Sequence, residues 1–269
     1  MRRIWKRVGC LLLFCLLIGS IQISAADKTS GKSTLKQLLQ TALQPVGSTM
    51  YVWGGAWNIQ DVAAGMEAKT IGVGPTWKEY FMRQTRHYDY RKTRYQIHNG
   101  LDCSGYVGWC IYNILNTKNG RKGYVMPAEW MAEYFAAWGW GEYTDKRKVK
   151  SHRPGDIMSS SGHVYIVVGE CADGSVVLMH SSPPGVQISG TATPRGKANS
   201  QAVRLARKYM KKYFPKWYKK YPENARGVGY LRDYHRMRWD LSGKTIMTDP
   251  DGYRNMSAKQ VLKDLFAGK

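Results

Sequence analysis

Apolar residues in one stretch of the chain recur at the alternating three- and four-residue spacing of a helix that packs on a core. The stretch begins at Cys103, and its apolar positions are Tyr106, Val107, Cys110, Ile111, Ile114 and Leu115. Asp102 stands where an N-cap belongs, and Asn119-Gly120 provides a stop. The pattern predicts a buried helix with a cysteine in its first turn.

The same spacing predicts three further helices. They cover residues 35–43 after a Ser33 or Thr34 cap, residues 127–138, and residues 257–266. Two stretches, at about 58–99 and 193–228, carry no single regular pattern. We interpret them as insertions, the first with at least one short helix and the second broken at Pro215.

Two runs rich in β-branched residues, 163–169 and 175–180, flank Asp173-Gly174, which is a hairpin turn signal. His163 begins the first strand and His180 ends the second. In an antiparallel pair these positions lie at the same end of the sheet, so the two imidazoles should meet. Residues 229–241 are expected to add another strand. Helices and antiparallel strands that occur in separate runs predict an α+β fold.

Residues 1–26 have the pattern of a signal peptide. Four basic residues precede an apolar run from Val8 to Ile23, and Ser24-Ala25-Ala26 offers a cleavage site near Ala26. An uncleaved anchor is the alternative, because the apolar run approaches spanning length. The sequence thus predicts an exported protein whose single domain covers residues 27–269.

The chain is strongly basic, with a net charge of +22 that becomes +18 without the leader. Such a charge implies an anionic environment, and export argues against nucleic acid and for cell-wall polymers or lipid headgroups. From Arg195 to Tyr221 there are ten basic residues and no acid, with aromatic residues between them. This region is either a solvated amphipathic helix or a contact for an anionic polymer.

Three cysteines, Cys103, Cys110 and Cys171, remain beyond the leader, too few for a disulfide scaffold. No spacing suggests a metal site, and no cofactor is expected. A cysteine at a helix N-terminus faces backbone N–H groups and the helix dipole, which favour the nucleophilic thiolate. Thiol chemistry also needs a base and a group that orients it. His163 and His180 can fill these two roles.

The ordered motifs Tyr51-Val52-Trp53-Gly54-Gly55, Asp102-Cys103-Ser104-Gly105, Pro154-Gly155-Asp156 and His163-Val164, followed by His180, resemble the NlpC-type cell-wall cysteine peptidases, a papain-like family. The resemblance implies a nucleophile-bearing helix packed on an antiparallel sheet. It also implies hydrolysis of peptidoglycan stem peptides at the γ-D-glutamyl to diamino-acid bond.

In that pattern Cys103 is the nucleophile, His163 the base and His180 the orienting residue. Tyr51 would be an oxyanion-side donor, and Asp102 and Ser104 would line the subsite for the amino end of the stem peptide. Apart from the resemblance, the Cys103 backbone N–H is a further candidate donor to the oxyanion. The two insertions depart from the family pattern. An amidase or acyltransferase on the same fold, a non-catalytic wall-binding protein, and a membrane-surface protein remain alternatives.

Overall fold

The computed structural model describes residues 32–56, 64–115 and 123–268. Contacts divide the chain into Met1–Gly31 and Lys32–Lys269, and the described residues all belong to the second unit. The expected signal peptide therefore lies outside the described residues. So do positions 58–63 of the first expected insertion and the expected helix stop at Asn119-Gly120.

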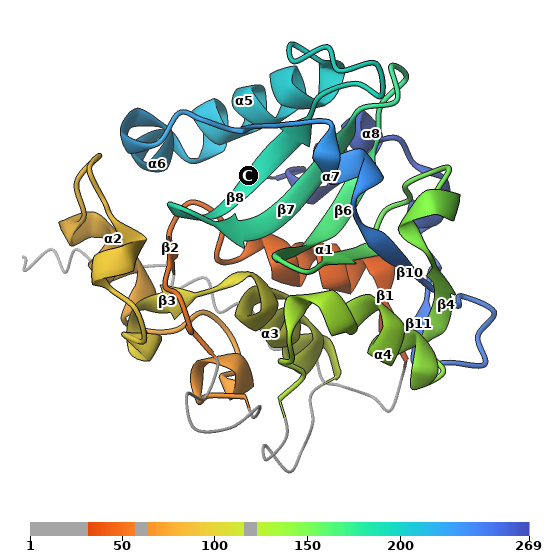
Figure 1. Cartoon of the computed structure of the whole chain (residues 1–269), viewed down its shortest axis with the longest axis horizontal. Coiled ribbons are helices and arrows are strands. Elements are labelled where there is room, and N and C mark those ends of the chain that lie inside the picture. Colours follow the sequence, from red (N-terminus) through yellow and green to blue (C-terminus); the bar gives the residue numbers. More distant parts are fainter. Residues whose placement is uncertain (1–31, 57–63, 116–122, 269) are drawn as a thin grey trace, which may run out of the picture. The chain divides into compact units, whose positions relative to one another are not determined.

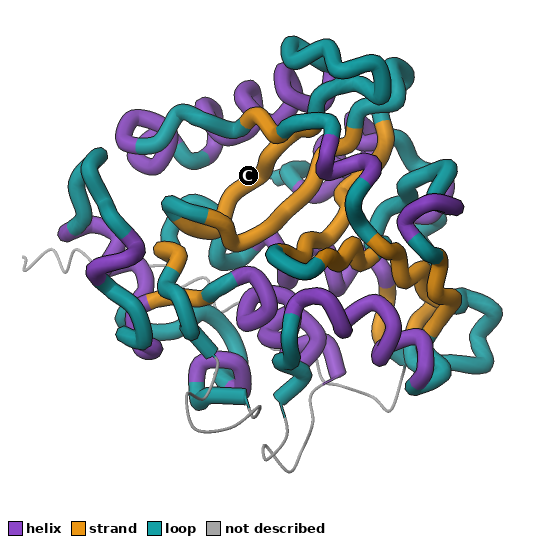
Figure 2. Tube along the Cα trace, viewed as in Figure 1, coloured by secondary structure: helices purple, strands orange, loops and turns teal. Residues whose placement is uncertain are grey.

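The described helices surround a central sheet (Figure 2). They are α1 (Leu35–Leu43), α2 (Trp77–Arg83), α3 (Cys103–Leu115), α4 (Met131–Ala137), α5 (Gln201–Tyr213), α6 (Pro215–Lys220), α7 (Gly229–Arg232) and α8 (Ala258–Leu265). Thr34 caps α1, and Ser257 caps α8, each through a reciprocal bond with a glutamine three residues on. These two helices confirm the spacing argument.

The large sheet is mostly antiparallel and curled, and its order is β3-β2-β8-β7-β6-β5-β10-β4, with β9 paired to β8. The strands are β2 (Met50–Tyr51), β3 (Gly100–Leu101), β4 (Gly141–Thr144), β5 (Ile157–Ser160), β6 (His163–Glu170), β7 (Val176–Ser182), β8 (Gly185–Thr191), β9 (Ala225–Arg226) and β10 (His235–Trp239). A separate pair joins β1 (Ser33–Thr34) to β11 (Met247–Thr248). The described unit is therefore a mixed α and β fold.

Helices cover both faces of this sheet (Figure 1). The α3 helix packs on β6 and β7 from one side, and α5 packs on β8 from the other. Strand β8 was not among the expected elements. It is buried along its whole length between β7 and α5, and its glycines and polar residues hid the alternation. At Gly190 even a Cβ atom would lie 2.2 Å from the Ala202 carbonyl carbon of α5.

Two other expectations needed correction. The expected strand at 229–241 is instead the short helix α7 followed by β10, which lies between β5 and β4. The expected helix at 127–138 starts as a 3-10 turn before α4. The Pro215 break in the basic-aromatic region is confirmed, because α5 ends before that residue and α6 begins with it.

The aromatic residues of α5 and α6 pack onto the body of the protein. Trp217 is fully buried against Phe81, and Tyr209 and Tyr213 lie against Phe266. The other cations of these helices remain exposed, whereas Lys220 donates to the Phe81, Met82 and Gln84 carbonyls. Among residues 32–56, 64–115 and 123–268, no helix combines the length and the apolar character that crossing a membrane requires.

Candidate active site

The first turn of α3 is locked in place by Asp102. Its Oδ1 accepts hydrogen bonds from the Gly105 backbone N–H at 2.7 Å and from the Ser104 hydroxyl at 2.9 Å. The expected N-cap is therefore confirmed. Because Asp102 and Ser104 are buried and bonded to each other, both are already engaged in building the helix terminus.

The paired glycines hold the chain close to this helix terminus. Gly54 has a positive φ of 78°, and a Cβ on Gly55 would lie 2.6 Å from the Gly100 carbonyl oxygen. Parallel pairing of β2 with β3 sets Tyr51 opposite Leu101, two residues before Cys103. The buried Tyr51 ring consequently lies near the thiol, and burial and the Cys103 charge both raise the pKa of its hydroxyl.

The two histidines form a direct hydrogen bond. His163 Nε2 lies 2.8 Å from His180 Nδ1, and the ring centroids are 5.0 Å apart. His180 is fully buried and comes two residues before the end of β7. The expectation that one end of the hairpin brings the imidazoles together is confirmed.

A third and a fourth side chain continue this chain of contacts. Ser189 Oγ on β8 lies 3.0 Å from His180 Nε2, and Arg226 Nε on β9 donates to the same nitrogen at 3.4 Å. An arginine N–H can only donate. With Nε2 accepting from Arg226, a neutral His180 carries its hydrogen on Nδ1 and can donate it to His163 Nε2.

The thiol lies at the start of β6. Cys103 is buried, and the backbone N–H of Val164, the residue after His163, contacts its sulfur. Burial raises the pKa of the thiol to about 12, and the Asp102 carboxylate adds to the rise. The N–H groups of Val164, Ser104 and Cys103 oppose it. The expected effect of the helix terminus on the thiolate is therefore present, and burial outweighs it in the pKa of the thiol.

The imidazoles are neutral at rest as well. Burial lowers the pKa of His163 to about 3, and the Arg226 guanidinium acts in the same direction. Burial, Arg226 and His163 together place the pKa of His180 well below its ordinary value. The resting site is therefore a neutral thiol beside two neutral imidazoles.

An open groove of about 660 Å³ adjoins His163. Tyr230 and Tyr234 line the groove and also lie beside His163. Their ring centroids are 5.7 and 6.4 Å from the centroid of the His163 ring. Both tyrosines also interact electrostatically with Cys103. The two tyrosines are therefore shared by the groove and the surroundings of the thiol.

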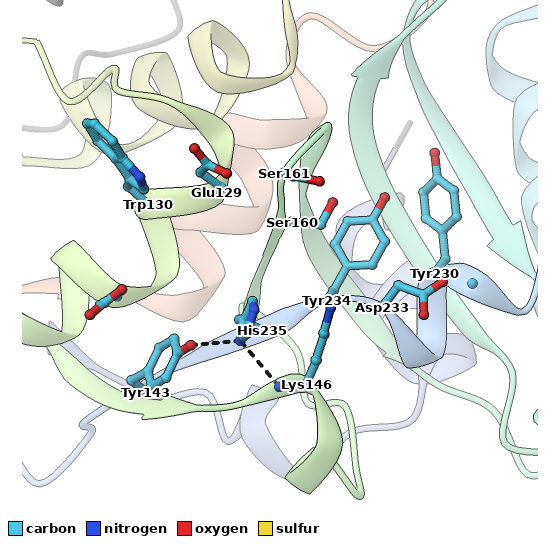
Figure 3. A pocket seen from close by; sticks show the side chains of 12 residues that line it. Glu129, Trp130, Tyr143, Lys146, Ser160, Ser161, Tyr230, Asp233, Tyr234 and His235 are labelled. Atoms are coloured by element: carbon cyan, nitrogen blue, oxygen red, sulfur yellow. Dashed lines mark hydrogen bonds between the residues drawn. The ribbon is translucent and has the colours of Figure 1, made fainter.

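The groove has acidic groups on two walls. Figure 3 shows Glu129 and Trp130 on one side, with Tyr230, Asp233 and Tyr234 across the groove. Within the described residues, neither Glu129 nor Asp233 forms an ion pair. Lys146 also lines the groove, but the three carboxylates of Glu129, Glu133 and Asp233 outnumber it, so the lining favours groups of positive charge.

The Pro154-Gly155-Asp156 motif is structural. The Asp156 carboxylate is 1% exposed and accepts two hydrogen bonds from Arg238, at 2.9 and 2.7 Å. The Gly155 carbonyl accepts from the Trp239 indole at 2.8 Å. These three hydrogen bonds fasten the turn before β5 to β10.

The structure places Asp102, Cys103 and Ser104 at the α3 terminus, with Tyr51 close by, and it joins His163 to His180. The two groups meet at Val164, the residue after His163, whose N–H contacts the Cys103 sulfur. The sequence argument missed Ser189, Arg226, Tyr230 and Tyr234. Arg226 ends the second insertion, and only the pairing of β9 with β8 carries it to His180. No local motif marks these four positions.

The chain matches no family model, no curated protein and no solved structure in the three comparisons made. Across the residues that the structure describes, no group of three or more His, Cys, Asp or Glu side chains could hold a metal ion. The site's chemistry must therefore be argued from its own geometry.

Proposed function

We propose that the protein is a secreted cysteine peptidase of the NlpC type, with a papain-like arrangement, that hydrolyses peptidoglycan stem peptides. The observation that supports this most is the Cys103 thiol at the first turn of α3, against Val164 and beside the hydrogen-bonded pair His163 and His180. Nucleophile, base and orienting group are the three parts that thiol catalysis requires.

The proposed reaction starts from neutral groups. His163 takes the thiol proton on Nδ1 as the Cys103 sulfur attacks the γ-carbonyl carbon of the D-glutamyl residue. His163 then returns the proton to the leaving amine of the diamino acid, and a thioester remains. Water, deprotonated by His163, attacks the thioester carbonyl and releases the glutamyl carboxylic acid, while the proton returns to the sulfur.

The groups around the thiol suit this proposal. The Cys103 backbone N–H and the Tyr51 hydroxyl are the candidate donors to the oxyanion. By the family resemblance, Asp102 and Ser104 line the subsite for the amino end of the stem peptide, in addition to capping α3. The acidic groove takes the other side of the scissile bond, where the diamino acid carries an amine.

The exposed cations of α5 and α6 suit an anionic cell wall. They are Arg204, Arg207, Lys208, Lys211, Lys212, Lys216 and Lys219. In the part of the chain that the structure describes, none of them is paired with a carboxylate. We include wall polymers that carry phosphate or carboxylate among the proposed partners. Because the aromatic rings of α5 and α6 pack onto the protein, we do not propose that they stack on the sugars of such a polymer.

The decisive experiment is a digest of purified muropeptides by the mature protein, analysed by mass spectrometry. We expect products cut after D-glutamate, at least a thousandfold slower formation with Cys103→Ala, and unchanged formation with Cys171→Ala. Cys171 is a matched control, because both thiols are 8% exposed and Cys171 lies in the loop between β6 and β7.

The products separate the alternatives. Cleavage or transfer at another amide would indicate the amidase or acyltransferase. Intact substrate in every sample, with protein that sediments with walls at low salt and is released at high salt, would indicate a non-catalytic wall-binding protein. Full activity of Cys103→Ala would end the cysteine peptidase assignment.

A further inference from the structure

Arg226 brings an unpaired positive charge to the histidine pair. Its Nε donates to His180 at 3.4 Å and its Nη1 donates to the Ala225 carbonyl at 2.9 Å. The negative charge of Glu223 acts to raise the pKa of Arg226. No carboxylate among the described residues, however, lies within ion-pair distance of the Arg226 guanidinium. Burial lowers the pKa of this guanidinium. A desolvated cation of this kind favours an anionic ligand.

The hydrogen bond from Arg226 to His180 also opposes catalysis. With Arg226 donating to Nε2, His180 holds its hydrogen on Nδ1 and donates it to His163 Nε2. A neutral His163 then carries its own hydrogen on Nδ1, the nitrogen that would have to take the thiol proton. His163 can act as a base only when its hydrogen is on Nε2 and His180 Nδ1 accepts it.

We propose that Arg226 binds a carboxylate of the substrate, and that this binding releases the histidine pair for catalysis. When the guanidinium turns from His180 to the carboxylate, His180 Nε2 takes a proton from solvent and donates it to Ser189 Oγ, which lies at 3.0 Å. The His180 Nδ1 hydrogen passes to His163 Nε2, and His163 Nδ1 gives its own hydrogen to solvent, so the pair keeps two hydrogens in all. His163 can then direct Nε2–H at His180 and present a lone pair to Cys103.

This inference rests on the proposed function, which also identifies the carboxylate. A γ-linked glutamyl residue keeps its α-carboxylate free, three carbons from the carbonyl that the thiol attacks. Arg226 is a suitable partner because it adjoins Tyr230, which also contacts His163 and interacts with Cys103. The predicted substrate class is therefore stems with a free glutamyl α-carboxylate, and not those in which it is an amide.

The first test follows Cys103 alkylation by iodoacetamide against pH, which requires no turnover. The titratable groups around the thiol and the histidine pair are Asp102, Tyr51, Tyr230, Tyr234 and Arg226, and burial raises the pKa of the carboxyl group and of the three tyrosines. Arg226 is the cation of this set. Arg226→Met should raise the rate at pH 7 about tenfold, since one charge shifts a neighbouring pKa by about one unit.

The control is Arg232→Met on α7. This exposed arginine donates to the Pro194 carbonyl, and its removal should leave the alkylation profile unchanged. Iodoacetate, an anionic probe, should react faster than iodoacetamide with the wild type and lose that advantage in Arg226→Met. An unshifted profile and an unchanged ratio of the two rates in Arg226→Met would overturn the inference.

The second test uses two stem peptides that differ only in an α-carboxylate or an α-amide on D-glutamate. The wild type should cleave the carboxylate form at least tenfold faster. Arg226→Met should raise KM for the carboxylate form and raise kcat for the amide form, and Arg226→Lys should restore the preference. A residue that only supports the fold would lower kcat for both peptides, and that result would refute the proposal.

The two proposals fail in different ways. If neither peptide is cut but Arg226→Met still changes alkylation as stated, the peptidase assignment falls and the control of the histidine pair by Arg226 stands. If both peptides are cut equally by all three proteins and alkylation is unchanged, the peptidase assignment stands and the role of Arg226 falls.

Discussion

Gly105→Ala tests whether the α3 terminus is held against the glycine turn. Alanine in place of glycine stabilises an ordinary helix by up to about 1 kcal/mol. Here the new Cβ would lie 2.2 Å from the Gly55 carbonyl oxygen and 2.8 Å from the Ala56 Cβ. The structure therefore predicts the opposite sign from helix propensity.

The magnitude follows from the obstructing atom. A backbone carbonyl cannot rotate away as a side chain can, so we take the upper end of the overpacking range, about 3 kcal/mol. After subtraction of the propensity gain, the free energy of unfolding should fall by about 2 kcal/mol. For a unit of this length, that loss lowers Tm by about 4 to 8 °C.

The assay is thermal and urea unfolding of the variant beside Gly227→Ala, where the added Cβ meets no atom within 4 Å. The control should behave as the wild type does. Alkylation of Cys103, two residues from the substitution, should change in Gly105→Ala alone. A Gly105→Ala protein that is as stable as the wild type or more stable would refute the described approach of the turn to the helix.

Two further predictions concern buried charge. Arg238→Met should lower the free energy of unfolding by about 3 to 5 kcal/mol, because it leaves the Asp156 carboxylate buried without a cation. The control Arg91→Met breaks an exposed ion pair and should have no measurable effect on stability. Equal losses of stability in the two variants would contradict the argument. Because the pKa of His163 is about 3 when folded and 6.5 ordinarily, the unfolded chain takes up a proton first as the pH falls. This histidine alone should lower the free energy of unfolding by about 2 kcal/mol from pH 7 to pH 5, and the other buried imidazole, His180, should add to that loss. His163→Gln should therefore lose less stability than the wild type in urea titrations at these two pH values, and an equal loss would refute the assignment to His163.

Local sequence patterns were sufficient to predict several helices, one helix cap and the histidine contact of this protein. The Cys103 helix, its Asp102 cap and the capped helix at the C-terminal end follow from side-chain periodicity and from capping hydrogen bonds, which act within one or two turns. The His163 and His180 contact also followed, because a hairpin has one register and both residues lie near its open end.

The state of the thiol depended on tertiary structure. Sequence position placed Cys103 among helix-terminal N–H groups, which favour the thiolate, but its pKa is set by how completely β6, the glycine turn and the tyrosines exclude water. Desolvation is a property of all the groups that surround a site. A short motif therefore cannot report it.

The sequence alone determined the features whose causes are local, namely helix faces, caps, the hairpin turn and the candidate site residues. Only the tertiary structure decided that β8 lies beside β7, that Arg226 returns from a distant insertion to His180, and that a groove adjoins His163. The physical reason is that pairing between distant segments depends on which surfaces remain to be buried after the local elements have formed. Periodicity within one segment carries no record of its partner in another.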